Sequence, residues 1–192
     1  MATPTSAYGP RFDEAVALAV TDFRARYRKN TTVPYITHLF AVTALVGEYG
    51  GDEDQLIAAV LHDWLEDVPG AHPHLLEVRF GARVRKLVED LSDSVGEPKP
   101  PWRARKEGYV AALRNKPAEL KLISAADKLH NCQTIRRDHK AVGEAIWARF
   151  SGRREGTIWY YQAVAEAIAH DWPHPLAERL ADEVAGLGAD GP

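Results

Sequence analysis

The sequence is poor in cysteine, with Cys132 as the one thiol among 192 residues. A single thiol cannot form a disulfide within the chain, and a zinc site built from several thiolates is excluded. No apolar run approaches the ~20 residues that cross a bilayer, and residues 1–10 have neither the basic nor the apolar region of a signal peptide. These absences predict a protein of a reducing, cytoplasmic compartment that has no membrane partner.

The chain also lacks an excess of positive charge. Its formal net charge is −3 and its isoelectric point is near 6.2, so it does not have the basic character of a protein that coats nucleic acid. We therefore expect a small-molecule partner rather than nucleic acid, and a local basic cluster must bind any phosphorylated ligand. Apolar residues make up 45% of the chain, which is enough for a sizeable core. Nothing in the sequence specifies an oligomeric state.

Strand signals are almost absent, whereas apolar residues recur with the helical period of about 3.6. The pattern predicts an all-α bundle of about nine or ten helices in one domain spanning 1–192, with a core of about 10–187 and a frayed tail at 188–192. A proline-rich loop is expected at 92–101. The predicted helices cover about 12–28, 34–49, 54–67, 73–79, 81–91, 102–114, 117–138, 142–150, 154–171 and 175–187.

The most informative stretch is the third predicted helix, which is apolar over 56–61 and then turns polar. At about 100° per residue, one arc of this helix holds His62, Asp63, Glu66 and Asp67. The opposite arc holds Leu61, Trp64, Leu65 and Val68. The helix therefore presents three carboxylates and an imidazole together while its back packs into the core.

Three carboxylates this close repel one another, and their ionised forms need a cation or several strong donors nearby. A divalent metal meets that need, because adjacent His and Asp can supply one nitrogen and one oxygen ligand. The alternative is a solvated acidic helix end, the usual meaning of a lone Glu-Asp pair. An imidazole directly after a buried run favours a site, since a buried polar group needs partners.

Two further residues match this chemistry. His38 lies near the start of the second predicted helix, where a lone histidine is more often a core or surface residue. Asp127 lies in an apolar stretch and shares a helical stripe with Ser124 and Asn131. A salt bridge from Asp127 to Lys128 or an arginine is one explanation, and metal ligation is the other.

Together these residues resemble the HD superfamily pattern of His, then His-Asp, then a distant Asp. The match extends to the hydrolase domain of the RelA/SpoT family, which also occurs alone as small alarmone hydrolases. It covers about residues 10–170, and it rests on the segments 34–38 (PYITH), 62–67 (HDWLED), 80–81 (FG) and 126–131 (ADKLHN). Trp64-Leu65 stands where the family commonly has a smaller pair.

The resemblance implies a hydrolase that removes pyrophosphate from the 3′ position of (p)ppGpp, an alarmone of the stringent response. It implies one Mn²⁺, with Fe²⁺ or Zn²⁺ as alternatives, held by His38, His62, Asp63 and Asp127. It gives Glu66 and Asp67 the role of positioning and activating the attacking water. It assigns nucleotide contacts to Arg28, Lys29 and Asn131.

Two basic clusters could bind phosphate, although each could also be a solvated helix face. The first comprises Arg24, Arg26, Arg28 and Lys29. The second follows the proline-rich loop and comprises Lys99, Arg103, Arg105 and Lys106, a position suited to a substrate clamp. The aromatic run 159–161 could stack on a base, but its helical spacing favours core packing.

Two other functions remain open from the residues. The same centre could act on another nucleotide, such as (p)ppApp or the 2′-phosphate of NADPH. The second is a metal-stabilised module that binds an alarmone without cleaving it. The pair Glu66-Asp67 argues against this function, because a binding module needs no water-activating carboxylates.

Overall fold

The computed structural model describes residues 8–92 and 101–189. Within these ranges the regular structure is helical, and an isolated antiparallel bridge between Tyr27 and Pro34 is the only β pairing. The chain divides into two compact units, Met1–Val95 and Gly96–Pro192. The helical structure of the described residues confirms the all-α class predicted from the sequence.

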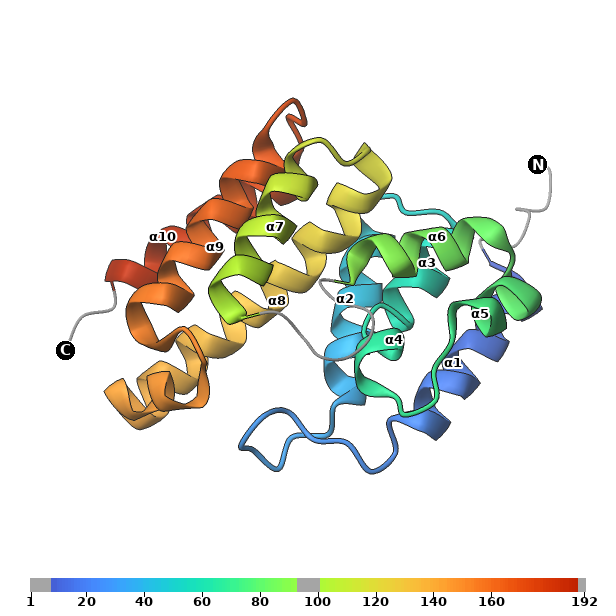
Figure 1. Ribbon diagram of the computed structural model, residues 1–192, viewed down its shortest axis with the longest axis horizontal. Coiled ribbons are helices and arrows are strands. Elements are labelled where there is room, and N and C mark those ends of the chain that lie inside the picture. Colours follow the sequence, from blue (N-terminus) through green and yellow to red (C-terminus); the bar gives the residue numbers. More distant parts are fainter. Residues whose placement is uncertain (1–7, 93–100, 190–192) are drawn as a thin grey trace, which may run out of the picture. The chain divides into compact units, whose positions relative to one another are not determined.

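Figure 1 shows the helices of the first unit, three of which begin at a local starting signal. They are α1 Pro10–Asp22, α2 Ile36–Glu48, α3 Glu53–Val60, α4 Trp64–Asp67, α5 Pro73–Phe80 and α6 Ala82–Leu91. Pro10 and Pro73 stand in the first turns of α1 and α5, where a missing N–H leaves no bond unmade. Asp52 caps α3 through a capping box with Gln55, which fixes the start of that helix.

Helix α3 is the central element of the first unit and packs against α1, α2 and α6. Its second half is wholly buried, and the residues with no exposed surface are Ile57, Ala58, Ala59, Val60 and Leu61. Burial on all sides stabilises the unit by about 25 cal/mol per Å² of apolar surface. The chain that leaves the end of α3 therefore starts from a fixed position in the core.

The second unit contains α7 Trp102–Arg114, α8 Ala118–Val142, the 3₁₀ helix η1 Gly143–Arg149, α9 Arg153–Ala169 and α10 Pro175–Ala189 (Figure 1). Helix α10 packs on α8 and α9, and α7 packs on α9. Cys132 is buried in α8, and burial raises the pKa of its thiol to about 12. This thiol is therefore an unreactive part of the core.

The first helix is shorter than predicted. It was expected to reach residue 28, but α1 ends at Asp22 and Phe23 begins a turn. Phe23 is buried with 1% of its surface exposed, so the chain must turn there to keep it in the core. The basic residues that follow lie in an irregular segment, which the bridge between Tyr27 and Pro34 closes.

The third predicted helix is not continuous. The prediction that its polar residues share one arc of a single helix is therefore wrong. Helix α3 ends at Val60, and α4 starts at Trp64 after a turn. His62 contributes to the break, because its ring bonds to the carbonyl oxygen of Ala59. His62 and Asp63 therefore lie in a turn between two helices rather than on one helical face.

The predicted loop 92–101 falls mostly at 93–100, outside the described residues. At the C-terminal end, α10 continues to Ala189, two residues into the expected tail 188–192. A search of the described residues finds no helix with the length and apolar character needed to span a membrane.

Candidate metal centre

Three side chains of the first unit converge beside the break between α3 and α4. His38, in the first turn of α2, places Nε2 3.6 Å from Oδ2 of Asp63. His62 Nε2 lies 3.1 Å from the same oxygen. The two imidazole rings are 5.1 Å apart, centroid to centroid. Both histidines are buried and Asp63 is half-buried, so these polar groups need partners other than bulk water.

The hydrogen bond made by His62 determines which of its ring nitrogens carries a proton and which one faces Asp63. Nδ1 of His62 lies 2.8 Å from the carbonyl oxygen of Ala59. Because a carbonyl only accepts, Nδ1 carries the proton, and a neutral ring then turns its Nε2 lone pair toward Asp63. A lone pair and a carboxylate oxygen 3.1 Å apart repel unless a cation or a proton lies with them. Two imidazoles and a carboxylate form a donor set that fits a divalent ion such as Mn²⁺, Fe²⁺ or Zn²⁺.

Tyr35, which immediately precedes α2, also contacts this centre. Its hydroxyl donates a 2.7 Å hydrogen bond to Oδ2 of Asp63. Burial, followed by the negative charges of Asp63 and Asp67, raises the pKa of Tyr35 far above its ordinary value. The phenol therefore stays protonated and remains a donor to the carboxylate.

Glu66 and Asp67 lie in α4, one turn beyond Asp63, and both are half-buried. The backbone N–H of Asp67 donates to the carbonyl oxygen of Asp63 over 3.0 Å, which ties this turn to the centre. Asp67 is also close enough to raise the pKa of Tyr35. The carboxylates predicted to activate water are thus held in a short helix next to the histidines.

Asp127, the fourth predicted ligand, lies in α8 of the second unit. It accepts hydrogen bonds from Lys128 Nζ and, over 2.5 Å, from Asn131 Nδ2. Burial alone would lower the pKa of Lys128, but Asp127 and the surrounding tyrosines raise it well above its ordinary value. The salt bridge that the sequence offers as one explanation for Asp127 is therefore present, with Asn131 on the other carboxylate oxygen.

Arg28 and Lys29 lie in the irregular segment between α1 and α2. The guanidinium carbon of Arg28 stands 5.4 Å from the centroid of the Tyr35 ring. Arg28 is half-buried, whereas Lys29 is exposed. Arg28 is thus placed one ring away from Asp63, so a cation and the candidate metal centre are on the same side of the first unit.

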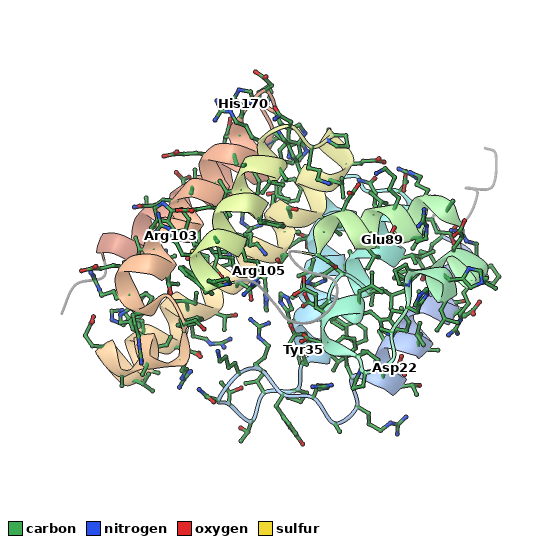
Figure 2. The ribbon with its side chains drawn as sticks, viewed as in Figure 1. Asp22, Tyr35, Glu89, Arg103, Arg105 and His170 are labelled. Carbon is green, nitrogen blue, oxygen red and sulfur yellow. The ribbon has the colours of Figure 1, made fainter. Side chains whose placement is uncertain are left out.

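The second basic cluster lies at the start of α7, and its members differ. Arg103 sits 3.3 Å from the Trp159 ring centroid and 2.7 Å from Glu107, so contacts within its own unit hold it. Lys106 lies over the Tyr160 ring at 4.5 Å. Arg105 is half-buried (Figure 2), and Lys99 lies outside the described residues. Within the aromatic run 159–161, Tyr160 and Tyr161 are buried in the core, whereas the Trp159 ring contacts the guanidinium of Arg103.

Sequence reasoning missed two contacts of this centre. It did not assign a role to Tyr35, although Tyr35 stands three residues before His38 in the same short motif. It placed Trp64 in the core, where the residue is buried, but did not predict that the Trp64 indole N–H donates a 2.7 Å hydrogen bond to Asp22. The spacing of Tyr35 and His38 could have indicated a shared face, but nothing in the sequence pairs Trp64 with α1.

Comparisons of the sequence identify its family and relatives. The profile of the HD domain family matches residues 15–158. The guanosine-3′,5′-bis(diphosphate) 3′-pyrophosphohydrolases MESH1 of Mus musculus and Homo sapiens are each 34% identical over 127 residues, a match that covers 65% of this chain and 69% of theirs. The bifunctional (p)ppGpp synthase/hydrolase SpoT of Escherichia coli K12 is 32% identical over 124 residues, which is 62% of this chain but 17% of SpoT. This chain therefore spans a small part of SpoT and most of the MESH1 proteins.

Solved structures agree as well. A metazoan orthologue of SpoT, described as hydrolysing ppGpp, has a TM-score of 0.76 and 25% identity, and the match covers 95% of this chain and 96% of that one. The protein lmo0812 of Listeria monocytogenes EGD-e has a TM-score of 0.71 at 22% identity, covering 80% and 99%, and shares the fold.

Proposed function

Because the chain belongs to the HD domain family, we propose that it is a metal-dependent nucleotide phosphohydrolase that removes pyrophosphate from the 3′ position of (p)ppGpp. One observation carries this proposal: the Nε2 atoms of His38 and His62 lie 3.6 Å and 3.1 Å from the same carboxylate oxygen of Asp63. The names and identities of the MESH1 relatives support the choice of substrate.

We further propose that Asp127 supplies the fourth ligand, so that the two units act as one hydrolase domain spanning residues 1–192. Mn²⁺ is the proposed ion by family resemblance, and Fe²⁺ or Zn²⁺ would suit the same donors. When bound, a divalent ion lowers the pKa of water and neutralises charge on phosphoryl oxygens. Tyr35 and Asn131 hold the two carboxylates in place by donating hydrogen bonds to them.

The remaining residues complete a hydrolysis that needs no covalent enzyme intermediate. Glu66 or Asp67 accepts a proton from the attacking water, whose oxygen bonds to the phosphorus attached to the 3′ oxygen. The bond between that phosphorus and the 3′ oxygen breaks, which leaves a 3′-hydroxyl and free pyrophosphate. Arg28 and Lys29, with Arg105 and Lys106 of α7, are the proposed cations for the substrate phosphates.

The test is incubation of the Mn²⁺-loaded protein with ppGpp, followed by chromatographic separation of the products. We expect pyrophosphate and GDP in equal amounts, and no orthophosphate. Parallel reactions with ppApp and NADPH identify another substrate, since NADPH would release orthophosphate. Tight binding of ppGpp without any product over hours would overturn the enzymatic proposal in favour of a binding module. The cytoplasmic location and the role in the stringent response remain predictions.

A further inference from the structure

Asp63 is held from two sides by residues that neither bind the proposed metal nor transfer a proton in the proposed reaction. On one side, the Tyr35 hydroxyl donates to its Oδ2 over 2.7 Å. On the other, the next residue in the chain, Trp64, donates its indole N–H to Asp22 over 2.7 Å. Trp64 is buried with 4% of its surface exposed, so this bond fixes the backbone immediately after Asp63.

Both supports lead back to the last residue and the cap of helix α1. The Tyr35 ring stacks on Phe23, with centroids 5.3 Å apart and planes 19° from parallel. Phe23 is the C-terminal cap of α1, and Asp22 is the last residue of that helix. Two neighbouring side chains at one helix end therefore support Asp63 by separate routes. Figure 2 labels Asp22 and Tyr35, which come from different elements.

Tyr35 also contacts groups on either side of Asp63. Its ring meets the His38 ring edge-on at 5.8 Å, and Arg28 covers its face at 5.4 Å. One aromatic side chain thus touches two residues of the metal centre and one proposed substrate cation. A residue that filled core space alone would not need its hydroxyl aimed at the carboxylate.

We propose that Asp22 and Phe23 of α1, acting through Trp64 and Tyr35, form a brace that positions Asp63 for its metal. This inference rests on the proposed function. A free aspartate side chain populates several rotamers, and a donor fixed on one oxygen removes that freedom before the ion arrives. Hydrogen bonds to metal-ligating carboxylates typically change metal affinity by about 10- to 100-fold. Tyr35 is therefore a positioning residue and not a catalytic one.

The decisive variant is Tyr35→Phe, which keeps the ring stack and removes the hydroxyl. Its matched control is Tyr27→Phe, because Tyr27 is an exposed tyrosine of the same segment. Mn²⁺ affinity of the metal-free proteins is measured by isothermal titration calorimetry, with metal-free melting temperatures as the check on folding. We expect Tyr35→Phe to bind Mn²⁺ about 10- to 100-fold more weakly, with an unchanged melting temperature, and Tyr27→Phe to match the wild type.

A second variant, Trp64→Phe, removes the other support and tests whether both act on one group. If they do, the loss of affinity in the double variant differs from the sum of the single losses, because the supports share Asp63. Excess Mn²⁺ should restore turnover in Tyr35→Phe, since a positioning defect is a defect of occupancy. Wild-type Mn²⁺ affinity in Tyr35→Phe would overturn the brace alone. Absence of stoichiometric Mn²⁺ binding in the wild type would overturn both the brace and the metal-dependent function.

Discussion

At the scale of single residues, hydrogen bonds determine which atom of each side chain faces the candidate metal centre. Nδ1 of His62 is committed to the carbonyl oxygen of Ala59, so Nε2 is the nitrogen available to an ion. Oδ2 of Asp63 faces both histidines and the Tyr35 hydroxyl. These hydrogen bonds and positions separate the proposed ligands from the proposed water-activating groups, because Glu66 and Asp67 lie a helical turn away in α4.

Two alanine variants test that separation of roles. Asp63→Ala removes an oxygen ligand, so metal and activity should be lost together. Glu66→Ala leaves the ligands in place, so metal should remain while kcat falls by about 10²- to 10⁴-fold, the usual contribution of a proton acceptor. Metal content of the purified variants by mass spectrometry, together with single-turnover rates on ppGpp, measures both effects. Retained turnover in Asp63→Ala would contradict the assignment. The control is Asp90→Ala, which removes a half-buried ion-pair partner of Lys86 in α6.

Sequence patterns predicted residue identities better than their geometry. His62 and Asp63 could be proposed because polar groups directly after a buried run are rare without partners, whereas His38 could be proposed only through the family resemblance. The break that brings them together could not be seen, since a period of about 3.6 continues across it. It accompanies a local bond from the His62 side chain back to Ala59 and a tertiary bond from Trp64 to Asp22, and the apolar pattern signals neither of them.

At the scale of elements, most helix positions followed from local signals and the errors came from tertiary packing. The predicted start at 73 is that of α5, and α1 and α3 begin at Pro10 and Glu53, two residues and one residue before their predicted starts at 12 and 54. Helix α8 runs to Val142, four residues beyond its predicted end at 138, and stops where Gly143 adopts a φ of 63°. Helix α1 ended early because burial of Phe23 outweighed the helical preference of the basic residues after it.

The packing of α7 on α9 gives a test at this scale. Gly152, which caps α9, lies so close to Trp102 that a Cβ there would stand 2.5 Å from the indole ring. Gly152→Ala should therefore destabilise the fold by about 1–3 kcal/mol, the usual effect of overpacking. Gly108→Ala is the matched control, because Gly108 is exposed within α7 and a Cβ there meets nothing within 4 Å.

That control should behave in the opposite way. Alanine is favoured over glycine in a helix interior by about 0.5–1 kcal/mol, so Gly108→Ala should raise stability. Urea unfolding of both variants, followed by circular dichroism, measures the two changes. Equal effects of the two substitutions would show that Trp102 does not fix the start of α7 against α9.

At the scale of the whole molecule, the proposed ligands come from both units. His38, His62 and Asp63 belong to the first unit and Asp127 to the second. An ion that binds only the folded state of the protein stabilises that state by mass action. The gain is about 2.7 kcal/mol when the concentration of free ion is a hundred times its Kd. If Asp127 is the fourth ligand, that stabilisation depends on a residue of the second unit.

The test is the rise in melting temperature that Mn²⁺ produces over the chelated protein, in the wild type and in Asp127→Asn. We expect a rise of several degrees in the wild type, because about 1 kcal/mol corresponds to roughly 2–4 °C in a chain of this size. Most of that rise should disappear in Asp127→Asn. The variant also loses its ion pair with Lys128, so the informative quantity is the metal-induced difference and not the melting temperature itself. The control is Asp138, which lies elsewhere on α8 and forms an ion pair with Arg149. Asp138→Asn should keep the full rise. An undiminished rise in Asp127→Asn would mean that the three ligands of the first unit bind the ion without the second.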